Sequence, residues 1–118
     1  MCEVVLELPY PPTVNHYWKH TRNGIHYVTK QGKAYQSAVG FLAKNTKKFT
    51  GKVALNVEIY PPDNRKRDID NIFKALFDSL TYAGVIADDS LINKLTAEKF
   101  APMKDGKVVV KIKGLENE

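Results

Sequence analysis

The chain has 118 residues, 43% of them hydrophobic, which is enough for one core and too short for two domains of ordinary size. It contains no long apolar run, and its N-terminus, MCEVVLELPYPP, carries Glu3 and Glu7 where a secretory signal needs a basic start. Cys2 is the only cysteine, which excludes an internal disulfide and a cysteine-based zinc site. We therefore expect one soluble, cytoplasmic domain over residues 1–118, with no membrane partner.

The net charge of +5 is unevenly distributed. No acidic residue lies between Glu7 and Glu58, whereas this interval contains eight Lys or Arg residues and all three histidines. The interval therefore carries +8 and the rest of the chain carries −3. Positive charge concentrated in this way predicts a polyanionic partner, and Lys19, Arg22 and Lys33 are candidate contacts to a DNA backbone.

The first half of the chain predicts a strand, a hairpin and a helix. Alternation over residues 3–8 indicates a strand that ends at Pro9. Asn23 and Gly24 separate two aromatic, β-prone runs, and this pair supplies the positive φ values of a two-residue hairpin turn. Apolar residues near helical spacing over residues 32–49 then predict a helix with a basic outer face.

The second half predicts a strand, a helix and two further strands. Residues 53–59 alternate without error, which indicates a strand, and Pro61 and Pro62 end it. Residues 70–83 predict a helix with Gly84 as its C-terminal cap. Strands near residues 94–100 and 108–113 follow. The order β-hairpin-α-β-α-β-β predicts an α+β fold, with two helices packed on one mixed β-sheet.

The segment RKRDIDNIFK, residues 65–74, sets three cations beside two carboxylates. Arg65, Lys66 and Arg67 suit the phosphates of a nucleic acid. Asp68 and Asp70 point the same way in an extended segment, and two such carboxylates repel unless a cation lies between them. Mg²⁺ prefers oxygen ligands of this kind, can polarise a phosphoryl oxygen and can lower the pKa of an attacking water.

Two later residues complete the candidate site. Lys74 lies one helical turn after Asp70 and is suited to neutralise negative charge that develops during phosphodiester cleavage. Asp89 lies beyond the helix and its Gly84 cap, so the chain must fold back for Asp89 to meet Asp68 and Asp70.

Ordinary structural roles also fit these residues. Asp68 or Asp70 could cap the helix, and Asp70 could form a surface ion pair with Lys74. Asp89 could cap a short turn beside a solvated Asp88, and Asp78 has the position of an exposed helix-face charge.

Two segments taken together resemble the RusA family of Holliday-junction resolvases. They are PPTVNHYW near the start and RKRDIDNIFKALFDSLTYAGVIADDSLI in the second half, so the resemblance runs over nearly the whole chain. It implies that Asp68, Asp70 and Asp89 are metal-binding catalytic carboxylates and that Lys74 is the catalytic lysine. It also places Asn15 and Asn71 near the site. Lys66 stands where many relatives have arginine, which keeps the charge but not a bidentate phosphate contact.

The resemblance further implies a homodimer that nicks opposite strands of four-way junction DNA, with Mg²⁺ or Mn²⁺, in DNA recombination and repair. Relatives are often encoded by phages or prophages.

Two other functions fit the same residues. One is a non-catalytic module for branched or single-stranded DNA, in which Tyr17, Trp18, His20 and Tyr27 stack on bases. The other is a metal-dependent nuclease for other branched DNA.

Overall fold

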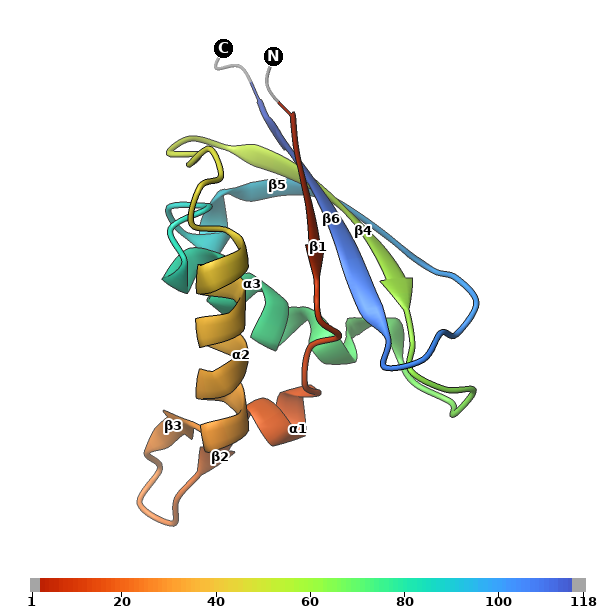
Figure 1. The fold of residues 1–118 in the computed structure, drawn as a ribbon. Helices are drawn as coiled ribbons and strands as arrows, with labels where there is room; N and C mark the ends of the chain where they lie inside the picture. Colours follow the sequence, from red (N-terminus) through yellow and green to blue (C-terminus); the bar gives the residue numbers. More distant parts are fainter. Residues whose placement is uncertain (1–2, 116–118) are drawn as a thin grey trace.

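The computed structural model describes residues 3–115, so Cys2 lies outside the described residues. Four strands form the main sheet in the order β1-β6-β4-β5. They are β1 (Glu3–Leu8), β6 (Lys107–Gly114), β4 (Val53–Tyr60) and β5 (Ile92–Lys99). β6 is antiparallel to both of its neighbours, whereas β4 and β5 are parallel, so the sheet is mixed (Figure 1). The predicted α+β class is confirmed.

Helices α2 (Lys30–Leu42) and α3 (Phe73–Tyr82) cover one face of this sheet (Figure 1). Alternate residues of β4, from Val53 to Ile59, point into the core and are at most 1% exposed. α3 supplies Leu76 and Leu80, which are fully buried, and each contributes roughly 1.5–3 kcal/mol through burial. The alternating apolar residues of β4 and the apolar stripe of α3 therefore pack against each other in one core.

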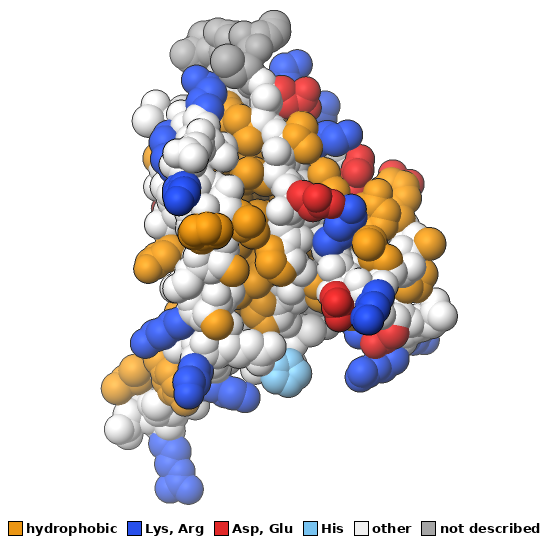
Figure 2. Space-filling model, in the orientation of Figure 1, with side chains coloured by type: hydrophobic (Ala, Val, Ile, Leu, Met, Phe, Trp, Pro, Cys, Tyr) orange, Lys and Arg blue, Asp and Glu red, His pale blue; other side chains and the backbone are white. Residues whose placement is uncertain are grey.

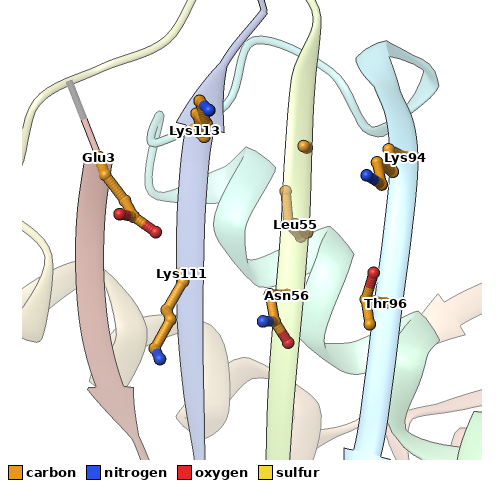
Figure 3. Close-up of a pocket in the computed structure, with 8 residues that line it drawn as sticks. Glu3, Leu55, Asn56, Lys94, Thr96, Lys111 and Lys113 are labelled. Carbon is orange, nitrogen blue, oxygen red and sulfur yellow. The ribbon is translucent and has the colours of Figure 1, made fainter. Parts of the chain in front are cut away.

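The other face of the sheet is not covered by either helix. It holds an open hollow of about 190 Å³, lined by residues from all four strands (Figure 3). Lys94, Lys111 and Lys113 line the hollow together with Glu3. Lys111 forms an ion pair with Glu58 at 3.2 Å, so one of these cations is already partnered.

The hairpin forms a separate two-stranded sheet of β2 (Trp18–His20) and β3 (His26–Val28). The predicted two-residue turn is wrong. Thr21 and Ile25 still pair through Thr21 N–H, at 2.8 Å, which leaves a three-residue loop. Gly24 has a φ of +78°, but Asn23 is not among the residues with positive φ. Three-residue hairpin loops commonly have one residue in the left-handed conformation, and Gly24 takes that position here.

The helix predicted over residues 32–49 is shorter and starts earlier. Thr29 caps it by accepting from Gly32 N–H, so α2 begins at Lys30 and ends at Leu42. The polar run after Ala43 has no apolar side chain to bury, and Phe49 instead joins the core through a parallel bridge to Ile86. A short helix that the sequence did not predict, α1 (Val14–Tyr17), precedes the hairpin.

The helix predicted over residues 70–83 has two parts. Its first turn is the 3₁₀-helix η1 (Ile69–Ile72), and α3 follows it directly. The C-terminal cap is confirmed, because Gly84 has a φ of +77° and donates to the Thr81 carbonyl while Val85 donates to that of Leu80. This pair of bonds is a Schellman motif. None of the helices formed by residues 3–115 has the length and apolar character needed to span a bilayer.

Candidate active site

Asp68 and Asp70 lie at the start of η1, directly before α3. Asp68 occupies the N-cap position, but its side chain accepts no capping hydrogen bond. Both residues are exposed, and among residues 3–115 neither carboxylate has a hydrogen-bond or ion-pair partner. Their oxygens are therefore available to an external cation, which a carboxylate engaged in capping would not be.

Asp88 and Asp89 precede β5, and their roles are the reverse of the alternative raised from the sequence. Asp88, not Asp89, caps the short 3₁₀-helix η2 (Asp89–Leu91) by accepting from Ser90 N–H at 2.9 Å. The Ser90 hydroxyl donates to the same oxygen, and these bonds lower the pKa of Asp88. Asp89 is exposed and leaves its carboxylate open, so the two neighbouring aspartates are chemically distinct.

The two ends of β5 separate Asp89 from the other two carboxylates. Asp89 stands three residues before Ile92, the first residue of β5. At the other end, Lys99 Nζ donates to the Arg67 carbonyl at 2.8 Å, which fixes the residue before Asp68 there. Ile92 and Lys99 are about 23 Å apart along a strand. Figure 1 likewise shows η1 and the segment after Gly84 at opposite ends of α3.

Within residues 3–115, no three His, Cys, Asp or Glu side chains come close enough to hold one metal ion. The sequence predicts that Asp68, Asp70 and Asp89 bind one metal ion together. A single chain does not bring the three carboxylates together, so this stays a prediction.

The Lys74 ammonium group contacts a residue of α3 and a residue of the hairpin. Its Nζ lies 3.3 Å from Asp78 Oδ2 and 4.0 Å from the centroid of the Trp18 ring. The ion pair is therefore with Asp78 and not with Asp70. Asp78 was predicted to be an exposed helix-face charge, but its side chain is 27% exposed and faces Tyr17, whose pKa burial raises to about 12. The i,i+4 spacing of Lys74 and Asp78 was the signal in the sequence that could have revealed this pair.

The three cations before Asp68 differ in environment. Arg67 donates to Asp63 Oδ1 at 2.7 Å, and its side chain is only 16% exposed. Arg65 is 80% exposed and 3.6 Å from the same carboxylate, and Lys66 is exposed. The bond from Arg67, together with that from Arg65 N–H, lowers the pKa of Asp63 to about 2. Arg67 thus organises the loop, whereas Arg65 and Lys66 are exposed to solvent.

The remaining predicted DNA contacts lie on α1, the hairpin and α2. Asn15, Lys19, Arg22 and Lys33 are all exposed, and Asn71 is half-buried on η1. Figure 2 shows the same division of charge that the sequence indicated: over α2 and the hairpin the charged side chains are Lys and Arg, while Asp and Glu side chains gather over the sheet. The hairpin reaches the candidate site through the contact of Trp18 with Lys74.

Comparison with known proteins gives consistent matches. Residues 9–113 match the family model described as "Endodeoxyribonuclease RusA". The chain is 36% identical, over 96% of both chains, to the "Crossover junction endodeoxyribonuclease RusA" of Escherichia coli strain K12. The similarly named proteins of Shigella sonnei strain Ss046 and Enterobacteria phage 82 are 35% and 34% identical, with the same coverage.

Proposed function

The chain belongs to the RusA family of endodeoxyribonucleases, and on that basis we propose that it resolves Holliday junctions by cutting DNA strands with a divalent metal ion. The family identification made from the motifs is confirmed. The observation that carries the proposal is the match to crossover junction endodeoxyribonucleases over 96% of the chain, which includes RKRDIDNIFK and the Asp88-Asp89 turn. We propose that it acts in the bacterial cytoplasm, and the bacterial and phage relatives support this.

The residues present fit a hard divalent cation. Asp68, Asp70 and Asp89 offer exposed carboxylate oxygens, and the described part of the chain places no cation against any of them. A bound Mg²⁺, or Mn²⁺ in its place, would polarise the scissile phosphate and activate water for hydrolysis. Arg65 and Lys66 would bind phosphates beside the cut, and Lys74 would balance the negative charge that develops there.

The position of Asp89 supports a site shared between two subunits. β5 is an edge strand, bonded to β4 on one side only, with Asp89 before its start and Asp68 near its end. If two β5 strands met antiparallel about a two-fold axis, Asp89 of each subunit would lie toward Asp68 and Asp70 of the other. We propose a homodimer of this kind, with two identical sites for two symmetric cuts.

The test is incubation with a labelled four-way junction in Mg²⁺ or in chelator. We expect paired nicks with metal and none with chelator. A mobility shift that is indifferent to metal, without nicks, would instead support a non-catalytic DNA-binding module. Competition with flap and fork DNA distinguishes a junction resolvase from a nuclease for other branched DNA.

Asp70→Asn should abolish cutting while junction binding stays intact or becomes stronger, because the change removes a metal ligand and a charge that repels phosphate. Asp88→Asn is the matched control, since Asn can also cap η2 and Asp88 is not assigned to the site. Loss of junction binding together with cutting would show that Asp70 is structural.

A further inference from the structure

The Lys74 ammonium group is held from two sides. Nζ lies 4.0 Å from the centroid of the Trp18 ring, and 3.3 and 3.4 Å from the two oxygens of Asp78. A ring face and a carboxylate both attract an ammonium group. A lysine side chain is otherwise flexible along its four-carbon stem, so these two partners restrict where its charge can lie.

The Trp18 ring is itself fixed by its neighbours on the hairpin. The His26 ring centroid is 5.2 Å from that of Trp18, and the His20 centroid is 5.8 Å away. His20 and His26 are paired across the hairpin and lie 3.9 Å apart, in an edge-on arrangement. The ring that receives Lys74 is therefore part of a three-ring cluster rather than a free surface side chain.

Tyr17, the residue before Trp18, connects the base of the hairpin to the start of α2. Thr29 N–H donates to the Tyr17 carbonyl at 2.8 Å, and the Thr29 hydroxyl donates to it at 3.0 Å. The same hydroxyl accepts from Gly32 N–H and so caps α2. Tyr17 is fully buried, and its hydroxyl accepts from Gln36 at 2.8 Å. Trp18 thus follows a residue that has little freedom to move.

From this chain of contacts we propose that Trp18 is a positioning residue: it holds the Lys74 ammonium group where phosphodiester cleavage needs it, and the hairpin is mounted on α2 to present that ring. The inference rests on the proposed role of Lys74 in cutting. It assigns the hairpin a part in the chemistry in addition to any contact it makes with DNA. A displacement of about 1 Å in such a group can cost about a hundredfold in rate.

The contact can be tested without DNA or metal, because Trp18 is the only tryptophan in the chain. Lys74→Met should change the intensity and wavelength of tryptophan emission. Lys44→Met is the matched control, since Lys44 Nζ lies 4.7 Å from the centroid of the Phe41 ring, in a cation–π pair at the C-terminal end of α2. Equal emission from the wild type and Lys74→Met would overturn the inference.

The consequence is tested by single-turnover cleavage of a four-way junction at saturating protein. Trp18→Leu should cut about tenfold more slowly or worse, with junction affinity within about twofold of wild type. Trp18→Phe, which keeps a ring face, should recover part of the rate and shows that the fold tolerates a change at this position. Phe41→Leu, which removes the control pair at the end of α2, should cut at the wild-type rate.

The outcomes separate this inference from the proposed function. If Lys74→Ala loses cutting but Trp18→Leu cuts as fast as wild type, the positioning role is overturned and the proposed function stands. If Trp18→Leu loses junction affinity rather than cleavage rate, Trp18 binds DNA and does not position Lys74. If Lys74→Ala itself cuts normally, the role of Lys74 and the inference both fail.

Discussion

Two glycines on the same helix give a matched test of how the hairpin is seated. A Cβ built on Gly32 would lie 2.6 Å from the Tyr17 carbonyl oxygen and 2.7 Å from Val28 Cγ1, whereas one built on Gly40 has no neighbour within 4 Å. Gly32→Ala should therefore destabilise the protein by about 1–3 kcal/mol through overpacking, although alanine is the better helix former. Gly40→Ala should stabilise it by about 0.5–1 kcal/mol.

Urea unfolding of both variants measures these changes in the free energy of unfolding. Changes of opposite sign at two positions of α2 would separate the clash from helix propensity, because propensity acts alike at both. If Gly32→Ala were as stabilising as Gly40→Ala, the hairpin base would not be packed against α2 as described. The sequence contains no sign of this difference, since both glycines fall within the helix predicted over residues 32–49 and only the tertiary contact distinguishes them.

The loop between β4 and η1 is the element in which the sequence was least informative. The apolar alternation of β4 and the apolar stripe of α3 are set by local periodicity, and both were predicted. The loop has no periodicity, so the three cations before Asp68 could be interpreted only by charge. The structure distinguishes them because Asp63, four residues before Arg67, engages that guanidinium and leaves Arg65 and Lys66 exposed.

The same loop predicts a measurable titration. Since the bonds from the Arg67 side chain and from Arg65 N–H lower the pKa of Asp63 from its ordinary 3.8 to about 2, the carboxylate supports the loop at neutral pH and loses this role as the pH falls toward about 2. Arg67→Leu should raise the midpoint toward 3.8, followed through the Asp63 carboxyl carbon by NMR. Arg65→Leu should raise it less, because its backbone N–H still donates to Asp63. Equal midpoints in the wild type and Arg67→Leu would refute the pairing.

At the scale of the whole molecule, the sequence motifs predict the site residues but not whether one chain can bring them together. The prediction of Asp68, Asp70 and Asp89 as site residues rests on the family motif. Their meeting depends on which ends of α3 and β5 they occupy and on what lies beyond the edge of β5. No local sequence pattern encodes a two-fold axis. Whether Asp89 meets Asp68 and Asp70 within one chain or across a dimer must therefore be measured.

Mixed dimers decide between a site within one chain and a site shared between two. Asp70→Asn and Asp89→Asn are each expected to be inactive alone. If the site is shared, a heterodimer of the two contains one doubly damaged site and one intact site. A random mixture, which is half heterodimer, should then recover about a quarter of the wild-type sites and nick one strand per junction. Sites confined to one chain would stay inactive in every dimer.

Asp68→Asn mixed with Asp70→Asn is the negative control, because both residues lie at η1 and no pairing of these subunits leaves an intact site. Recovery in the first mixture alone, measured as single nicks on a labelled junction, would place Asp89 across the subunit interface.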